Sequence, residues 1–365
     1  MKVEYGIWDS ATSSVKYSEQ RYAVVVPAHS SDKSYWIKIS IINKAEKASF
    51  TGEFNWLLDG CDPLSADYIS LTSVEMQATG SAGTYKVSFS GDGEYIGNLV
   101  FPSEVNGSEV TAIAANSTLT PAQKNQVTSV YIPDSVQTIG ANAFNGYTNM
   151  KTVTFEQNET ASGASVQSAS GLTSIGNAAF KDCSILTEIE IPTSVTTVGS
   201  GVFSGCGKLD SIEIADGNTA YYVDGNCLIE AATKTLKKGF NTSIIPDDVI
   251  KIDAEAFMGC TGLLEIVIPA GVTSIGKNAF YGCVAVETLT FNANLTKDVA
   301  ESPFANLGKN ATKTVLNIDC SDVTQYMFNN CSSIDELNLS TNVRTIKASA
   351  FNGCSGLISI DIPNG

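Results

Sequence analysis

Nine cysteines and a single histidine are the residues of this chain best suited to chemistry. Six cysteines share one position of a repeated pattern, in three pairs 23 residues apart: Cys183, Cys206, Cys260, Cys283, Cys331 and Cys354. Cysteines stacked in this way could form disulfides, bind a metal ion, or serve as small buried apolar side chains. Parallel side chains do not turn toward one another as a disulfide requires, and no C-x-x-C pair is present. We therefore expect reduced, buried thiols and no metal site.

Nucleophilic catalysis has little support in the sequence. His29 lies in the polar segment 27–32, and nothing in its spacing relates it to Cys61 as a catalytic dyad. The chain has no G-x-S-x-G elbow, and the glycine-rich stretch 91–97 is one residue too long for a dinucleotide fingerprint. We expect no catalytic residue and no cofactor.

Paired carboxylates are the remaining indication of an enzyme. Glu188 and Glu190 lie two residues apart on an expected strand, and Glu213 should lie beside Glu190 on the next turn. Separations of about 5–7 Å overlap the spacing used in glycoside hydrolysis. A general acid must be buried to raise its pKa, however, and the face of a short strand offers no evident cleft. We favour a solvated acidic face over an active site.

An internal repeat positions all of these residues. Its clearest marker is a recurring aromatic residue: Phe144, Phe180, Phe203, Phe257, Phe280, Phe304, Phe328 and Phe351. Two long steps mark insertions near residues 156–170 and 215–243, and a degenerate earlier copy begins at Leu99. Repeats of this length indicate a solenoid, here of about nine turns.

Each turn reads L-x-x-I-x-I-P-x-x-V-x-x-I-G-x-x-A-F-x-x-C. The segment L-x-x-I-x-I predicts a short strand with alternate residues inward, and proline ends it because it cannot donate to the next ladder bond. One turn cannot bury its apolar face alone, but stacked turns bury a continuous core. Phe280, in the middle of the stack, should be a core residue.

The repeated string of Ile-Pro, Val, Ile-Gly, Ala-Phe and Gly-Cys resembles the BspA-like, or Treponema-type, leucine-rich repeats of bacteria. The resemblance covers roughly residues 94–365, and segment 218–236 is similar to a hairpin common in that family. It implies a mostly β leucine-rich-repeat stack of 23-residue turns with a parallel sheet. The usual asparagine ladder is missing, and its position carries Ser135, Ser194, Asp248 and Gly271. The turns must therefore satisfy their backbone groups in another way.

Residues 1–80 do not repeat, whereas 81–365 form the expected solenoid. The first part alternates in β fashion over Lys2–Trp8, Tyr22–Val26, Tyr35–Ile42, Ala48–Trp56 and Ile69–Met76. This pattern predicts a small antiparallel β-sandwich or a capping domain. Capping the open end of the solenoid and separate binding are both open roles for it.

The charge of the chain restricts its partners and its location. Asp and Glu number 38 against 22 Lys and Arg, for a formal net charge of −16. Nucleic acids and anionic membranes require a basic face, which argues against both. No apolar run approaches a transmembrane span, and Met1–Asp9 lacks the features of a signal peptide. We expect a signal peptide that has been removed and an extracellular or cell-surface protein; a native Met1 is the alternative.

The resemblance implies a non-enzymatic adhesin that binds proteins or glycans of a host or neighbouring cell. The alternatives are a structural or receptor-binding component of a larger assembly, such as a phage virion, and a carbohydrate-active enzyme. Two sets of residues are candidates for contact with a partner. The first comprises outward acidic positions on the strands: Glu188, Glu190, Glu213, Glu265, Glu336 and Asp361. The second is Tyr221 and Tyr222, which belong either to a protruding binding hairpin or to the packing of that hairpin on the solenoid.

Overall fold

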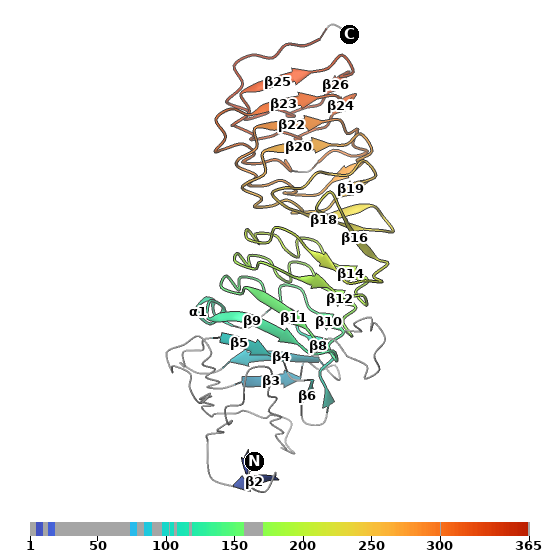
Figure 1. Ribbon diagram of the computed structural model, residues 1–365. Coiled ribbons are helices and arrows are strands. Elements are labelled where there is room, and N and C mark those ends of the chain that lie inside the picture. Colours follow the sequence, from blue (N-terminus) through green and yellow to red (C-terminus); the bar gives the residue numbers. More distant parts are fainter. Residues whose placement is uncertain are drawn as a thin grey trace.

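The structure is a computed structural model, and its turns stack along one axis toward the C-terminus (Figure 1). It describes residues 97–101, 103–105, 108–116, 119–156, 171–299 and 301–363, and the backbone of four earlier strands. Within these residues the chain forms about nine turns of mostly short parallel strands, as the repeat predicts. A single short helix, α1 (Pro121–Lys124), is present in the described part and is capped by Thr120. None of the helices described is long and apolar enough to cross a membrane.

Most turns carry parallel strands on two sides. One side, the long-strand face, holds the strands predicted from L-x-x-I-x-I: β5 (Gly97–Val100), β9 (Val127–Ile132), β11 (Thr152–Phe155), β13 (Glu190–Ile191), β15 (Glu213–Ile214), β20 (Glu265–Ile268), β22 (Thr288–Phe291), β23 (Val315–Ile318) and β25 (Glu336–Leu339). The other, the short-strand face, holds two-residue strands: β8 (Ala112–Ile113), β10 (Thr138–Ile139), β12 (Ser174–Ile175), β14 (Thr197–Val198), β19 (Lys251–Ile252), β21 (Ser274–Ile275), β24 (Asp322–Val323) and β26 (Thr345–Ile346). Inward residues alternate with outward ones along the longer strands.

The short-strand sheet continues toward the N-terminus. The hairpin of β3 (Val74–Ala78) and β4 (Thr84–Phe89) pairs antiparallel, and β4 joins β8 in parallel. A hairpin in this place covers the edge that β8 would otherwise expose. Two further hairpins pair β1 (Tyr5–Asp9) with β2 (Ser14–Ser18), and β6 (Glu104–Val105) with β7 (Ser108–Glu109). The remaining strands predicted before residue 70 lie outside the described residues, so the sandwich and the boundary near residue 80 stay predictions.

The marker phenylalanines stack along the interior. Ring centroids lie 5.2 Å apart for Phe144 and Phe180, 4.8 Å for Phe257 and Phe280, and 5.0 Å for Phe280 and Phe304. The rings of these pairs are within 14° of parallel. Phe280 is fully buried, as predicted for a core residue in the middle of the stack.

The aligned cysteines form a second ladder beside the rings. All six are buried and free, as are Cys227 and Cys320, whereas Cys61 and His29 lie outside the described residues. Each aligned thiol donates to a backbone carbonyl of the preceding turn: Cys183 to Phe144, Cys206 to Phe180, Cys260 to Gly239, Cys283 to Phe257, Cys331 to Phe304 and Cys354 to Phe328, at Sγ···O distances of 3.1–3.3 Å. The residue type is thereby explained, because cysteine is small, apolar and still a weak donor.

Serine hydroxyls take over part of the role of the absent asparagine ladder. The Ser135 hydroxyl donates to the Val110 carbonyl at 2.9 Å, and the Ser194 hydroxyl donates to the Leu172 carbonyl at 2.6 Å. Each bond joins one turn to the turn before it. The turns therefore satisfy backbone carbonyls through short side chains, which need less interior space than an asparagine.

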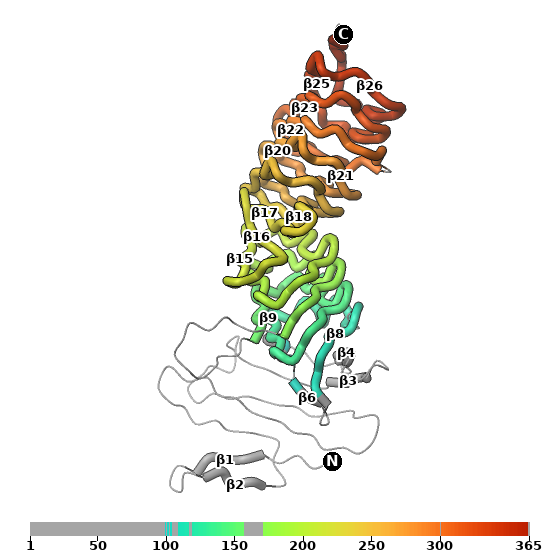
Figure 2. Tube along the Cα trace, turned by 90° about the vertical axis from the view of Figure 1, so that its right-hand side faces the viewer, coloured from blue at the N-terminus to red at the C-terminus, as the bar shows by residue number. Residues whose placement is uncertain are grey.

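The long insertion forms a three-stranded meander, β16 (Tyr221–Asp224), β17 (Cys227–Glu230) and β18 (Thr235–Gly239), between two stacks of turns (Figures 1 and 2). Neighbouring strands of the meander are antiparallel, and β18 then pairs in parallel with β19. Side chains of β17 alternate between two cores: Leu228 packs in the core of the first stack, and Ile229 packs in the core of the second. The meander is thus a shared wall between the stacks, which agrees with the packed alternative for this segment and not with the protruding one.

The meander also substitutes for a turn of the repeat. In most turns the backbone amide of a marker phenylalanine donates to the carbonyl of the residue before the next marker phenylalanine. The Gly239 amide makes the same bond to the Ala256 carbonyl at 3.0 Å, and the Gly239 carbonyl accepts the Cys260 thiol. The Phe257 ring lies where a side chain at 239 would be, since a Cβ there would come within 2.0 Å of that ring. An ion pair of Lys181 with Glu255 at 2.7 Å joins the two stacks, and an ion pair of Lys237 with Asp253 at 2.5 Å joins the meander to the second stack.

Candidate functional site

Three of the candidate glutamates meet in one place on the long-strand face. Strands β13 and β15 pair in parallel with Glu190 opposite Glu213, so the predicted neighbour relation holds. Glu188, Glu190 and Glu213 line a hollow of about 220 Å³, which we call the acidic hollow. The expectation that this face offers no cleft is therefore corrected.

The acidic hollow follows from an interruption of the sheet. Strand β11 has four residues, but the next turn meets it through a single bridge between Thr152 and Glu188. The following strand, β13, spans only Glu190–Ile191. Because the ladder is not continuous, the backbones of the two turns leave a shallow depression with Val153 and Phe155 in its wall.

The other acidic candidates lie apart from this group. Glu265 is exposed on β20. Glu336 on β25 forms an ion pair with Lys313 at 2.5 Å, which lowers the pKa of Glu336. Asp361 is exposed in the last described segment, where no strand forms. None of the six acidic candidates is buried, but they do not form one continuous site.

The two candidate tyrosines have different environments. Tyr221 is 2% exposed and packs in the core of the first stack. Its hydroxyl accepts a hydrogen bond from the Val198 amide at 2.7 Å, at the edge where the short-strand sheet of the first stack ends. Of the two interpretations of Tyr221, the structure therefore supports packing.

Tyr222 points to the opposite side of β16 and is half-buried. Its hydroxyl accepts a hydrogen bond from the Lys234 ammonium at 2.9 Å and lies 3.3 Å from a carboxylate oxygen of Asp248. Lys234 and Asp248 form an ion pair at 2.8 Å, which raises the pKa of Lys234 and lowers that of Asp248. Tyr222 therefore remains a candidate contact residue, although its hydroxyl already has partners.

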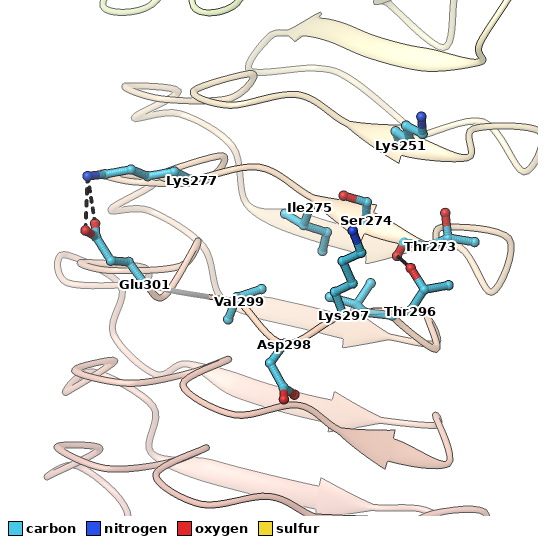
Figure 3. Close-up of a pocket in the computed structure, with 11 residues that line it drawn as sticks. Lys251, Thr273, Ser274, Ile275, Lys277, Thr296, Lys297, Asp298, Val299 and Glu301 are labelled. Atoms are coloured by element: carbon cyan, nitrogen blue, oxygen red, sulfur yellow. Dashed lines mark hydrogen bonds and ion pairs between the residues drawn. The ribbon is translucent and has the colours of Figure 1, made fainter.

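A second pocket, which the sequence interpretation missed, lies on the short-strand face between β21 and residues 295–301 (Figure 3). It has a volume of about 480 Å³, within the range of small-molecule sites. Its wall contains Lys251, Lys277 and Lys297, and we call it the basic pocket.

One additional residue in the turn produces the basic pocket. Nine residues separate Leu295 from Phe304, whereas eight separate Val272 from Phe280. Residues 295–299, the bulged segment, contain no strand, so the sheet of β19 and β21 does not continue to β24. The irregular step of 24 residues from Phe280 to Phe304 was the signal in the sequence that marked this place.

Side chains replace the missing ladder bonds on the far side of the bulged segment. The Asn294 amide oxygen accepts the Ser321 amide at 2.8 Å, and the Asp298 carboxylate accepts the Gln325 amide at 3.2 Å. The Asp298 bond joins the bulged segment to the next turn. On the other side the Thr296 amide donates to the Thr273 carbonyl at 3.0 Å, but no strand of the bulged segment pairs with β21.

The described residues contain no group of three or more His, Cys, Asp and Glu side chains able to hold a metal ion. The acidic hollow and the basic pocket both open to solvent. The wall of the acidic hollow holds hydroxyl and carboxylate groups, and the wall of the basic pocket holds these and ammonium groups. Arrangements of this kind can bind a ligand by charge and hydrogen bonds.

The chain is similar to several solved structures. A leucine-rich repeat protein from Bacteroides ovatus has 24% identity and a TM-score of 0.41, over 80% of this chain and 81% of that one. The pneumococcal vaccine antigen PcpA has 16% identity and a TM-score of 0.44, over 76% and 87%. A leucine-rich cell surface protein from Faecalibacterium prausnitzii has 19% identity and a TM-score of 0.32, over 73% and 93%.

No curated protein matches the chain. The model of the BspA type leucine rich repeat region matches six copies, at residues 122–215, 236–304 and 250–365, which together exceed half of the chain. The chain belongs to the BspA type leucine rich repeat family.

Proposed function

We propose that the protein is a non-enzymatic binding protein of a bacterial cell surface and contacts a protein partner through the acidic hollow. Membership in the BspA type repeat family supports a binding role. The geometry supports the acidic hollow as the contact region, because the stacked turns present an extended surface on which one depression collects three carboxylates.

The observation that carries this proposal is the meeting of Glu188, Glu190 and Glu213 in one depression. Glu188 and Glu213 are exposed, so their charges act on an approaching partner. Like charges held near one another by a rigid backbone favour a ligand of opposite charge. We propose a lysine- or arginine-bearing segment of a partner protein as that ligand.

Replacing the three carboxylates by amides tests this proposal. The triple variant E188Q/E190Q/E213Q should bind host matrix proteins and neighbouring bacterial cells with an association rate lower by roughly tenfold, because electrostatic steering is lost. The matched control D216N/D224N/D247N removes the same charge at three exposed positions outside the hollow.

The control variant should bind like the wild type. Equal binding by the wild type and the glutamine triple, on every surface to which the wild type binds, would exclude the acidic hollow. Tyr222→Ala in the same assay tests the second candidate region.

A further inference from the structure

We infer that the basic pocket binds a sugar that carries an anionic group. The ligand class follows from four properties of the pocket: its volume, its two exposed lysines, its hydroxyl groups and its apolar wall. The basic pocket lies on the short-strand face, away from the acidic hollow on the long-strand face.

The charges in the wall leave two lysines available. Lys277 is paired with Glu301 at 2.9 Å. Asp298 is occupied by Lys347 at 2.8 Å, and it also accepts the Gln325 amide. Lys251 and Lys297 are exposed, and neither has an ion-pair partner within the part of the chain that the structure describes.

The carboxylates of the wall do not neutralise these two lysines. The chain has an excess of acidic residues, for a net charge of −16, yet both carboxylates in this wall are held by other groups. An ammonium without a carboxylate partner is a strong donor to a carboxylate or sulfate oxygen of a ligand. Figure 3 shows the Lys297 side chain extending across the pocket toward Ser274.

Hydroxyl groups add the polar contacts that a sugar requires. Thr273 and Thr296 donate their hydroxyl protons to the carbonyls of Ile250 and Thr273, at 3.2 and 3.3 Å. Their oxygens therefore keep acceptor capacity for the hydroxyl groups of a ligand. Ser274 is exposed beside them and can donate or accept.

The rest of the wall is apolar. Ile275 is 7% exposed, and Leu295 and Val299 are half-buried. A pyranose ring has one face of C–H groups that packs on such side chains and removes apolar surface from water. A volume of about 480 Å³ suits a small oligosaccharide better than a protein segment, which needs a larger interface.

Isothermal titration with three oligosaccharides of similar size tests the inference. The probes are a trigalacturonate with carboxylates, a sulfated galactan oligosaccharide and a neutral galactotriose. We expect the purified chain to bind at least one acidic probe and to bind the neutral probe at least about tenfold more weakly. The two acidic arms distinguish carboxylate from sulfate as the preferred group.

Charge-neutral variants locate the site. K251Q/K297Q should lose at least about tenfold in affinity for the acidic probe. The control K208Q/K309Q removes the same charge at two exposed lysines outside the basic pocket and should keep its affinity. All four lysines are exposed, so neither variant should alter folding.

Lysine acetylation measured by mass spectrometry provides an independent readout. The acidic probe should protect Lys251 and Lys297 and leave Lys208 and Lys309 reactive. Binding of neither acidic probe, equal affinity for the neutral probe, or equal losses in the two double variants would overturn the inference. None of these outcomes bears on the acidic hollow, because its test uses different residues and different ligands.

Discussion

The meander and the bulged segment are two interruptions of the same repeat with opposite consequences. The meander lies within the 54-residue step from Phe203 to Phe257, yet its side chains are part of both hydrophobic cores. The bulged segment adds one residue, yet it ends a sheet and leaves a pocket of about 480 Å³. The size of an insertion therefore does not determine its effect.

The difference lies in what each insertion contributes to packing. The meander brings its own apolar residues, Leu228, Ile229 and Phe240 (the last directly after β18), which fill the cores on both sides of it. It also brings its own strands, of which β18 pairs with β19. One additional residue supplies neither an apolar side chain for the interior nor a pairing partner for β21. The effect of an insertion in this chain therefore depends on whether it brings apolar residues and strands of its own.

If the meander is part of the core, truncating a large buried side chain there should lower the free energy of unfolding as much as truncating one in the central stack. We expect both Phe240→Ala and Phe280→Ala to lower the free energy of unfolding by about 3–5 kcal/mol, from transfer and cavity terms. Val299→Ala in the bulged segment should cost less than about 1 kcal/mol, because Val299 is only half-buried. Urea denaturation measures all three, and a loss below about 1 kcal/mol for Phe240→Ala would remove the meander from the core.

The hydroxyl of Tyr221 should connect the meander to the first stack. Tyr221→Phe keeps the ring and leaves the Val198 amide without its acceptor, so we expect a loss of about 1–3 kcal/mol. Tyr222→Phe is the matched control, because its hydroxyl bonds lie near the surface, and its loss should stay under about 1 kcal/mol. Equal losses for the two variants would mean that the Tyr221 bond does not support the junction.

The interior predicted from the repeat is largely the interior observed. Phe280 and the aligned cysteines could be placed because each apolar position recurs in every turn, and stacking brings equal positions together. The orientation of Tyr221 and Tyr222 could not be predicted. A strand between two stacks has a core on both sides, so alternation alone does not show which ring is exposed.

The surface was harder to predict than the core. The repeat predicts that Glu190 lies opposite Glu213. The acidic hollow, however, depends on how far the hydrogen-bonded ladder between β11 and the next turn extends. Two ion pairs, Glu336–Lys313 and Asp298–Lys347, join residues of different turns. Such pairs depend on the reach of long side chains, which spacing in the sequence does not define.

The buried Cys283 thiol gives the regular interior a dependence on pH. Burial raises the pKa of Cys283 well above its ordinary value of 9.0. Above pH 9 the unfolded chain releases this proton and the native chain retains it, so stability falls as pH rises. This thiol should lower the free energy of unfolding by about 1 kcal/mol between pH 9 and pH 10.

Cys283→Ala isolates this contribution. The variant should lose about 1 kcal/mol less than the wild type over that interval, as measured by urea denaturation at each pH. Parallel pH profiles for the two proteins would show that the thiol is not protected from ionisation.

The bulged segment contains no cysteine, so deleting Lys297 should leave the dependence of stability on pH unchanged.

Deleting Lys297 also tests the origin of the basic pocket. The deletion restores the eight-residue step from Leu295 to the marker phenylalanine, so the shortened segment should pair with β21 and close the pocket. We expect the free energy of unfolding to change by less than about 1 kcal/mol while binding of acidic sugars disappears. A crystal structure of the deletion variant that retains the pocket would contradict this explanation.

Hydrogen exchange measured by mass spectrometry compares the two interruptions directly in the unmodified protein. Amides of β17 should exchange as slowly as those of β20 and β22, since they are paired on both sides and lie between two cores. Amides of residues 295–299 should exchange much faster, because no strand forms there. Exchange of β17 at the rate of residues 295–299 would contradict the account of the meander as a shared wall of the core.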